Sequence, residues 1–300
     1  MMAPSDLRIA DIIGSETSSR QKAALIGFPS DEGVRVNGGR TGASEAPEKI
    51  FTRLMQLTPH PLYSDQQEGL IKRTSPPNML ACSGSVTSDQ DLLANEVSEA
   101  LNRGVLPVIA GGGHETAFGH FSGYAKSKKP VHILNIDAHT DVRPLKEGLP
   151  HSGSPFRQAL EDSSGSCKSY TVLGLQPSSV AKEHLSFVND HGSAVFAEDL
   201  TLQDVKKYFR KLESESASES VMVTMDMDAV DQSHAPGVSA PNAAGISSRL
   251  WLDIALYCGK QPNVTSFDLC EVNPKYDRDG QTVRLAALTI WTYLLGVSLR

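Results

Sequence analysis

The stretch NIDAHTDVRP, residues 135–144, holds three strong metal-ligand types at alternate positions: Asp137, His139 and Asp141. Alternate residues of an extended strand point to the same side, about 6.6 Å apart, so three of them span about 13 Å. Metal–oxygen bonds, by contrast, are about 2.0–2.2 Å long. One ion therefore cannot bind all three side chains from a straight strand. Either the backbone curls after Asp137, or more than one ion is bound.

Two other apolar runs lead to side chains of the same kinds. TMDMDAVD, residues 224–231, carries two aspartates, and AGGGHETAFGH, residues 110–120, leads through three glycines to a histidine. Ligands of open α/β sheets bind beyond the carboxyl ends of the strands. We therefore expect six side chains at one sheet edge: His114, Asp137, His139, Asp141, Asp226 and Asp228. The glycine run has neither the GK[ST] ending nor the GxGxxG spacing of a phosphate-binding loop.

The charge of these six side chains favours a metal centre. Four carboxylates brought together would repel one another, and some would take up protons, unless cations compensated them. Two divalent cations cancel four negative charges, and two neutral imidazoles complete the ligand shells. The set is rich in oxygen and contains no thiolate, so it favours Mn²⁺ over Fe²⁺, Co²⁺ or Zn²⁺. Each aspartate alone is better explained as a helix cap or turn residue, so the metal prediction depends on the joint pattern.

Short apolar runs that alternate with helical patterns must position these ligands. Several runs are apolar on both faces, as in a parallel sheet that helices cover. The expected strands are 23–28, 105–111, 131–136, 170–175, 193–197, 221–226 and 264–269. This repetition predicts an α/β protein, a three-layer α/β/α sandwich with a central parallel sheet.

Local signals predict where several helices begin and end. We expect helix starts at Ser88, which precedes Asp91 by three residues, at Thr201 with Asp204, and at Ser247. The apolar stretch 285–299 is too short for a membrane span and predicts a buried C-terminal helix. The biased stretch ESESASES, 213–220, is expected to be a solvated loop.

Composition narrows the class of protein. The chain has 300 residues, of which 39% are hydrophobic, and a formal net charge of −7. We expect one domain over 1–300, with 1–21 as a flexible or peripheral segment, and no nucleic-acid or membrane partner. The four cysteines form no CxxC pair, and the N-terminus lacks the pattern of a signal peptide. These features predict reduced thiols and a cytoplasmic location.

Three motifs resemble the ureohydrolase family, which includes arginase, agmatinase and formimidoylglutamase. They are GGGHE (111–115), DAHTD (137–141) and DMDAVDQSHAPGVSAP (226–241), and the resemblance runs from about residue 22 to 298. It implies an α/β/α sandwich, a homo-oligomer (trimer or hexamer) and two Mn²⁺ per subunit. One ion would be held by His114, Asp137, Asp141 and Asp226, and the other by Asp137, His139, Asp226 and Asp228.

The resemblance also implies a reaction and its catalytic residues. A water between two metal ions becomes hydroxide near neutral pH, and this hydroxide would attack a guanidino or amidino carbon. Asp141 or Asp228 would pass a proton to the leaving nitrogen, and Asp141 matches the family's usual candidate. His151 would shuttle protons or orient the substrate. Glu271 would pair with the cationic substrate nitrogens, because a carboxylate and an amidinium have complementary geometry. The alternatives are a surface loop position for His151 and a turn cap for Glu271.

Within the family, several segments resemble formimidoylglutamases more than arginases. Arg143 stands two residues after Asp141, where arginases carry a neutral amide. The guanidinium of an arginine there would bind a substrate carboxylate more strongly. Arg35 and Arg40 are expected at the entrance of the same substrate site. The alternative for Arg143 is a surface ion pair. The other segments are 32–50, 114–124, 151–156 and 271–287.

The resulting hypothesis is hydrolysis of N-formimidoyl-L-glutamate to L-glutamate and formamide, a step of histidine degradation. This substrate has two carboxylates and one amidine, so it needs cationic partners. The alternative is another ureohydrolase, acting on arginine, agmatine or a guanidino acid. A non-catalytic metal-binding regulatory protein and a single-zinc deacetylase of related fold are further alternatives.

Overall fold

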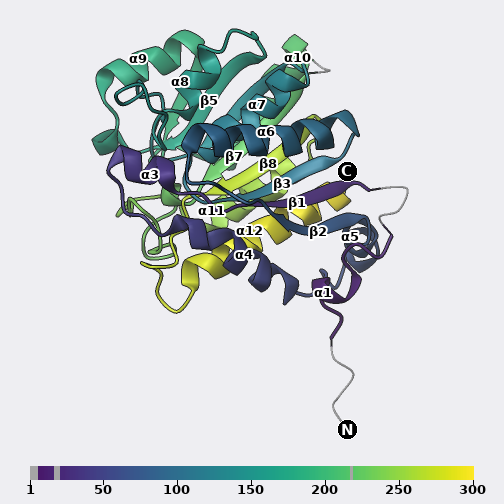
Figure 1. Ribbon diagram of the computed structural model, residues 1–300. Coiled ribbons are helices and arrows are strands. Elements are labelled where there is room, and N and C mark those ends of the chain that lie inside the picture. The colour runs from purple at the N-terminus through teal and green to yellow at the C-terminus, as the bar shows by residue number, and fades with distance from the viewer. Residues whose placement is uncertain (1–5, 17–20, 217–218) are drawn as a thin grey trace.

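The computed structural model describes residues 6–16, 21–216 and 219–300 (Figure 1). Its middle layer is an eight-stranded sheet in the order β2-β1-β3-β8-β7-β4-β5-β6, with every neighbouring pair parallel. The strands are β1 (Ala23–Phe28), β2 (Thr74–Met79), β3 (Leu106–Gly111), β4 (Val131–Ile136), β5 (Cys167–Leu175), β6 (Gly192–Phe196), β7 (Ser220–Asp226) and β8 (Val264–Cys270). Helices cover both faces, so the predicted three-layer α/β/α sandwich is confirmed.

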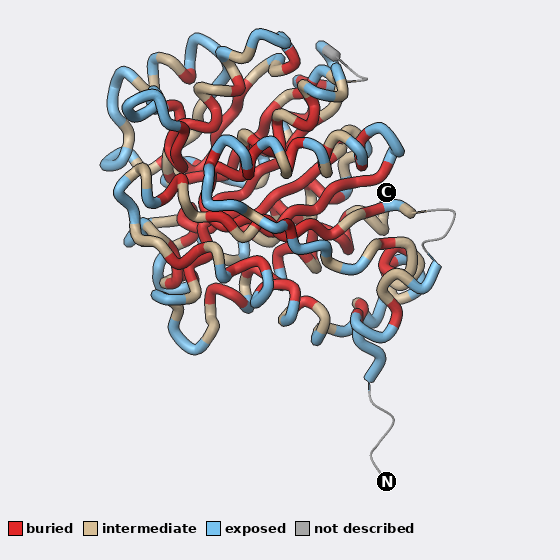
Figure 2. The backbone as a smooth tube through the Cα atoms, viewed as in Figure 1, coloured by how far each residue is buried: buried red, intermediate tan, exposed pale blue. Residues whose placement is uncertain are grey.

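The central strands form because their apolar side chains are buried on both faces of the sheet. All six residues of β3 are buried, and so are five of the six residues of β4. Such doubly covered strands appear in the sequence as nearly continuous apolar runs, which is why the seven predicted strands are confirmed. Figure 2 shows the same burial as a continuous layer through the middle of the molecule.

Strand β2 was not predicted. Its sequence, TSPPNM, contains Pro76 and Pro77, and prolines are normally a sign against a strand. β2 pairs only with β1 and therefore forms one edge of the sheet. Because an edge strand needs ladder hydrogen bonds on one side only, it tolerates prolines that a central strand would not.

Helices on the two faces enclose separate apolar cores. Residues of α6, α7, α8 and α9 pack on one face, and residues of α1, α4, α5, α10, α11 and α12 pack on the other. The bounds are α1 (Ile9–Ile12), α3 (Glu32–Asn37), α4 (Ala46–Met55), α5 (Ser64–Ile71), α6 (Val86–Asn102), α7 (Thr116–Lys126), α8 (Pro155–Leu160), α9 (Lys182–His191), α10 (Leu202–Ser216), α11 (Ser248–Lys260) and α12 (Gln281–Ser298). Short 3₁₀ turns are η1 (Ala43–Glu45), η2 (Pro177–Ser179) and η3 (Met227–Ala229).

Two of the three predicted helix starts are confirmed. Ser247 caps α11 by accepting a hydrogen bond from the Leu250 N–H, and Thr201 bonds to Asp204 at the start of α10. The prediction of Ser88 was wrong, because Ser85 is the N-cap of α6. The carboxylate of Asp89 accepts backbone hydrogen bonds from Ser83 and Gly84, which fixes the earlier start.

The expected loop over 213–220 is largely wrong. Helix α10 continues to Ser216, and β7 begins at Ser220, while 217–218 lie outside the described residues. The exposed Glu213, Ser214 and Glu215 suit the outer face of a helix as well as a loop. Composition alone therefore could not separate the two structures.

Both ends of the chain contribute to packing. In the N-terminal segment, α1 buries Ile9 and Ile12 against the core, so part of the segment expected to be peripheral is packed. The parts of that segment at 1–5 and 17–20 lie outside the described residues. The predicted C-terminal helix is confirmed as α12, which packs on α11, α4 and α5. Among the described helices, none combines the length and apolar character that a membrane crossing requires.

Candidate metal and substrate site

The four central strands of the sheet bring the six predicted ligands and Glu271 together at their carboxyl ends. Asp137 directly follows β4, Asp226 is the last residue of β7, and Asp228 lies in η3. His114 follows β3 after two glycines, and Glu271 directly follows β8. Because β3, β8, β7 and β4 are adjacent, residues far apart in the sequence meet within a few ångströms.

The glycines before His114 are required by close backbone packing. A Cβ on Gly112 would lie 2.0 Å from the carbonyl oxygen of Ser30, which belongs to the loop after β1. A Cβ on Gly113 would lie 2.2 Å from Oε2 of Glu115. The chain therefore turns from β3 into α7 with no room for side chains, and this turn places His114 at the sheet edge.

The first ligand group surrounds one ring nitrogen of His114. Its Nδ1 lies 2.9 Å from Asp141 Oδ2, 3.1 Å from Asp226 Oδ2 and 3.2 Å from Asp137 Oδ2. Suitable ligand atoms of these four residues all lie within 4.8 Å of one another. This is the same set of four that the resemblance implied for one metal ion.

A second ligand group lies beside the first and shares Asp137. His139 Nδ1 is 3.1 Å from Asp228 Oδ2 and 3.5 Å from Asp137 Oδ1. Asp226 was expected in this group as well, but here its Oδ1 accepts a hydrogen bond from the Asp228 N–H at 2.8 Å. The second group therefore consists of Asp137, His139 and Asp228, with Asp137 between the two sites.

The backbone after Asp137 curls, and two ligand groups form, so both solutions to the spacing of this stretch are present. Oδ1 of Asp137 accepts a hydrogen bond from the His139 N–H at 2.7 Å, which closes a tight turn. Asp141 has a φ of 45°, in the left-handed region that non-glycine residues seldom adopt. This conformation turns Asp141 back toward His114.

A buried hydrogen-bond chain fixes the orientation of His114. Its Nε2 is 2.9 Å from Thr224 Oγ1, and the Thr224 hydroxyl donates to Asp268 Oδ1 at 2.6 Å. Since that hydroxyl proton goes to Asp268, Thr224 must accept the proton of His114 Nε2. The nitrogen that faces the three carboxylates is therefore Nδ1, the one available to a metal. Asp268 also contacts His120 Nδ1 at 2.6 Å, and all four side chains are buried.

This arrangement fits a bound cation. A bare Nδ1 lone pair that faces three carboxylate oxygens would be repelled, unless a proton or a metal ion lay between them. Oδ1 of Asp228 is buried and has no hydrogen-bond partner among the described residues. Such an oxygen is costly to bury unless a ligand binds it. Oxygen-rich donors with two imidazoles suit Mn²⁺.

The pKa values of these groups reflect the crowded negative charge. Burial raises the pKa of Asp226 well above its usual range, and the neighbouring Asp228 and Asp137 charges raise it further. Burial also raises the pKa of Asp228, to about 6. Burial alone would lower the pKa of His114, but hydrogen bonds to three aspartates raise it well above its ordinary value. Without metal, protons take the place of the missing positive charge.

Glu271 faces the same cavity from the end of β8. Its Oε1 accepts a hydrogen bond from the His114 N–H at 2.9 Å, while the buried Oε2 has no partner among the described residues. Burial raises its pKa well above the usual range, and the charges of Asp226 and Glu115 add to the effect. Its φ of 65° is again left-handed. The free oxygen is therefore aimed into a place where a cationic group would be stabilised.

The ligands open into a cavity of about 350 Å³ whose rim carries arginines. Arg143 lines this cavity, is exposed, and donates to Asn37 Oδ1 at 3.3 Å. It makes no ion pair among the described residues, so the alternative of a surface ion pair is not seen. Arg40 also lines the cavity and stacks on Tyr276, with its guanidinium carbon 4.1 Å from the ring centroid.

Two predicted residues lie differently from the expectation. Arg35 pairs with Glu32, its neighbour on α3, and is not among the residues that line the cavity. His151 is buried, and both of its ring nitrogens face backbone: Nδ1 accepts from the Gly153 N–H, and Nε2 bonds to Pro144 O. It lies beside the site rather than in the cavity wall, and its catalytic role stays a prediction.

Sequence reasoning missed the residues that support the site from behind. Thr224 and Asp268 sit inside strands β7 and β8, where nothing distinguishes them from other polar strand residues. Glu115 is buried behind the glycine turn, and its Oε1 accepts a hydrogen bond from the Gly33 N–H at 2.8 Å. Burial raises the pKa of Glu115 to about 8. Its position directly after His114 was the one signal available for it.

The fold and this ligand set define a class: α/β/α sandwiches with a binuclear carboxylate–histidine metal centre at the carboxyl edge of a parallel sheet. The chain belongs to the arginase family, whose family model matches residues 21–296. Formimidoylglutamase of Geobacillus thermodenitrificans is 37% identical over 286 residues, covering 94% of this chain and 86% of the relative.

Solved structures agree with this assignment. A crystal structure of Trypanosoma cruzi formiminoglutamase with Mn²⁺ has a TM-score of 0.87 and 28% identity, and covers 98% of this chain and 99% of that one. An arginase from Bacillus subtilis shares the fold, with a TM-score of 0.75 and 20% identity over 91% of this chain and 98% of that one.

Proposed function

We propose that this protein is a Mn²⁺-dependent hydrolase that converts N-formimidoyl-L-glutamate and water to L-glutamate and formamide. The observation that carries the proposal is that one cavity holds two groups without a charged partner among the described residues. One is the buried Oε2 of Glu271, and the other is the guanidinium of Arg143. Glu271 offers a partner for an amidinium, and Arg143 offers one for a carboxylate. The names of the relatives, formimidoylglutamase and formiminoglutamase, support the same substrate.

The metal ligands are the six predicted residues: His114, Asp137, His139, Asp141, Asp226 and Asp228. Two bound Mn²⁺ ions would supply water of lowered pKa as the nucleophile and would stabilise negative charge as it develops. His114 is held for this task by Thr224 and Asp268, which fix the ring so that Nδ1 faces the carboxylates. Asp137 lies between the two groups and is the residue placed to contact both ions.

The remaining residues bind the substrate and handle protons. Glu271 Oε2 accepts hydrogen bonds from the amidinium, and this new charge pair offsets the cost of burying the carboxylate. Asp141, at the cavity wall, passes a proton from the attacking water to the leaving nitrogen, which must be protonated as the C–N bond breaks. His151 fixes the loop beside Asp141 through its two backbone hydrogen bonds, and it orients the substrate only through this loop, which also carries Arg143.

The rim of the cavity selects an acidic substrate. Arg143 binds a glutamate carboxylate through its guanidinium, and Asn37 holds that guanidinium toward the cavity. Arg40 is immobilised by Tyr276 and by the carbonyl oxygens of Val238 and Ser239, and it adds a second positive charge. Agmatine has no carboxylate, and arginine has one, so this rim suits both less well than a dicarboxylate.

A substrate comparison tests the proposal. Mn²⁺-loaded protein is incubated separately with N-formimidoyl-L-glutamate, arginine, agmatine and a guanidino acid, and formamide, glutamate and urea are measured. We expect formamide and glutamate from the first compound and little urea from the others. Urea from arginine, with no glutamate from the formimidoyl compound, would identify an arginase instead. Metal binding without turnover of any compound would support the regulatory alternative.

We also propose that the protein assembles as a trimer or hexamer in the cytoplasm. Membership of the family supports the homo-oligomer. All four cysteines are free thiols, which supports a reducing compartment. Light scattering of the purified protein at several concentrations tests the assembly, and a monomer throughout would contradict it.

A further inference from the structure

A second and larger cavity lies at the opposite edge of the sheet. Its volume is about 620 Å³, within the range of small-molecule sites, whereas the metal cavity measures about 350 Å³. Residues that precede or begin β1, β2, β3, β4, β7 and β8 line it, so it spans the amino ends of the strands that carry the metal site. A strand of six residues is about 20 Å long, which separates the two cavities.

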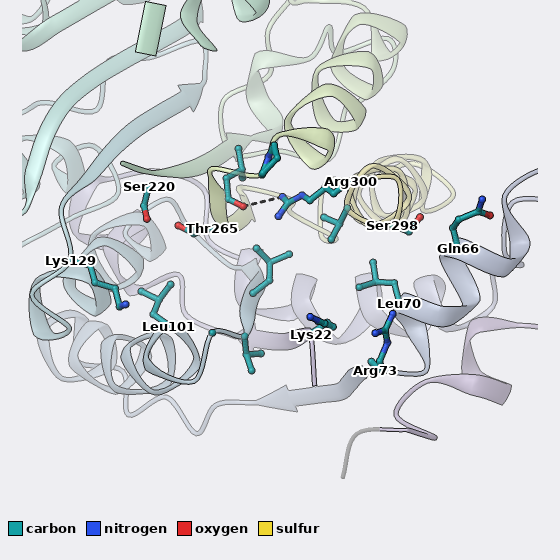
Figure 3. A pocket seen from close by; sticks show the side chains of 16 residues that line it. Lys22, Gln66, Leu70, Arg73, Leu101, Lys129, Ser220, Thr265, Ser298 and Arg300 are labelled. Atoms are coloured by element: carbon teal, nitrogen blue, oxygen red, sulfur yellow. Dashed lines mark hydrogen bonds between the residues drawn. The ribbon is translucent and has the colours of Figure 1, made fainter. Parts of the chain in front are cut away.

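The lining combines positive charge with apolar surface. Its charged residues are four cations, with no aspartate or glutamate: Lys22, Arg73, Lys129 and Arg300. Figure 3 shows these side chains, from four different parts of the chain, around one hollow. Leucines and valines lie between them: Leu70, Leu101, Val105, Leu106, Val264 and Val297. In a chain with a net charge of −7, this is a local concentration of the opposite sign.

These cations lack acidic partners, although neighbouring lysines have them. Lys72 and Lys126 pair with Glu68 and Asp91. In contrast, no ion pair between described residues includes any of the four cations of the cavity. Basic side chains near helix C-termini can also donate hydrogen bonds to the last carbonyl oxygens of the helix. This would be the simpler explanation for such a cluster.

Hydrogen bonds to backbone carbonyl groups explain only the two arginines of the cluster. Arg73 donates to Gly69 O, and Arg300 donates to Gly259 O and Val264 O. Arg300 is thereby fixed in the lining of the cavity, and Figure 3 draws its hydrogen bond to another lining residue as a dashed line. The ammonium groups of Lys22 and Lys129 make no hydrogen bond to the described residues. Among the described residues, no hydrogen bond or ion pair therefore engages the charge of these two lysines.

We propose that this cavity binds a small dianion with an apolar body, at a site separate from the metal centre. The ammonium groups of Lys22 and Lys129 and the fixed guanidinium groups contact the charged ends, and the leucines and valines contact the body. Phosphate monoesters and dicarboxylates share this chemistry.

Isothermal titration calorimetry of the Mn²⁺-loaded protein with benzene-1,3-disulfonate tests the proposal. This probe keeps two charges, has an apolar ring, and coordinates Mn²⁺ weakly, so it does not strip the metal. We expect one binding site per chain, with an affinity that falls as salt is raised. Lys129→Gln and Lys22→Gln should each weaken binding about tenfold, since each removes one charge-assisted contact.

Lys128→Gln is the matched control. Lys128 is the neighbour of Lys129 but lines a different depression, so the same change of charge there should leave the affinity unchanged. Arg143→Ala is the second control, because Arg143 lines the metal cavity. This variant should bind the probe with unchanged affinity, which shows that the probe does not bind at the metal cavity. Melting temperatures confirm that each variant is folded. Phenyl phosphate and isophthalate as titrants then show which of the two anion classes binds more tightly.

Three results would overturn the proposal: no heat of binding to the wild type at millimolar probe, equal affinity in Lys128→Gln and Lys129→Gln, or loss of the site in Arg143→Ala. None of these depends on turnover. Failure of the second site is therefore distinguishable from failure of the proposed reaction, which the product assay measures.

Discussion

At the scale of single residues, two of the five described non-glycine residues with a left-handed φ lie where the chemistry is expected. Asp141 and Glu271 both have left-handed φ values, 45° and 65°. Such conformations are uncommon outside glycine and persist where the surrounding structure enforces them. Here the enforcing contacts are Phe156 N–H to Asp141 O and Glu271 N–H to Gly112 O. Both carboxylates are thus held in position before any substrate arrives.

Arg143 is the residue that most directly tests substrate choice. Arg143→Ala should raise KM for N-formimidoyl-L-glutamate by about tenfold to a hundredfold, because it removes a charge-assisted hydrogen bond worth about 1.5–3 kcal/mol. Steady-state kinetics measures this, and kcat should change little. Arg35→Ala is the control, since Arg35 pairs with Glu32 away from the cavity. A fall in kcat with unchanged KM would contradict the binding role.

Asp268 should act on the metal through Thr224 and His114 without touching it. Asp268→Asn removes the acceptor charge that orders this chain of hydrogen bonds and should weaken Mn²⁺ binding about tenfold to a hundredfold. Metal titration of the metal-free protein reads this directly, with no need for turnover. Thr224→Ser, which keeps the hydroxyl, should retain most of the affinity. Unchanged Mn²⁺ binding in Asp268→Asn would exclude the role.

At the scale of elements, the passage from β3 to α7 is the most constrained junction of the site. Three features meet there: the glycine turn, the His114 ligand, and the hydrogen bond from the Gly33 N–H to Glu115 Oε1. That bond ties the start of α3 to the start of α7. Since α3 ends in Asn37, which contacts Arg143, the same junction that places a metal ligand also places the rim that meets the substrate.

Gly112→Ala tests this junction. The new Cβ would lie 2.0 Å from Ser30 O, a backbone atom that cannot move aside freely, so we expect a loss of about 2–4 kcal/mol in unfolding free energy. Urea unfolding measures the change. Gly69→Ala, in helix α5 with open space around it, should instead stabilise by about 0.5–1 kcal/mol. Equal stability of the two variants would refute the close packing.

At the scale of the whole molecule, the sheet separates two cavities of opposite charge. The carboxyl edge gathers buried carboxylates, and the amino edge gathers lysines and arginines. Parallel strands make this possible, because all of their carboxyl ends lie at one edge and all of their amino ends at the other. The carboxylates at the carboxyl edge need cations for stability, so metal binding should raise the free energy of unfolding.

Removal of the metal tests this linkage. Treatment with a chelator should lower the melting temperature, because the four crowded carboxylates must then take up protons or repel one another, and the binding free energy of the ions is lost. Each site at a hundredfold excess of Mn²⁺ over Kd contributes about 2.7 kcal/mol. Calorimetric melting with and without Mn²⁺ measures the shift, and metal analysis should give two ions per chain. An unchanged melting temperature would show that the cluster needs no cation.

The sequence by itself determined the strands and the ligands. Apolar runs on both faces identify buried parallel strands, because their neighbours are apolar wherever they lie, and six ligand types at strand ends converge in any open parallel sheet. Features that depend on the particular neighbours could not be predicted: β2 at the edge despite its prolines, the position of Arg35 away from the cavity, and the cationic cavity.

Tertiary structure also decided how the ligands are held. His114 Nε2 meets Thr224, which is 110 residues away, and the His114 N–H meets Glu271, 157 residues away. No local pattern encodes such contacts, because they depend on which strands lie side by side. Strands β1 and β2 are consecutive along the chain and pair, but only the folded sheet placed β3 between β1 and β8.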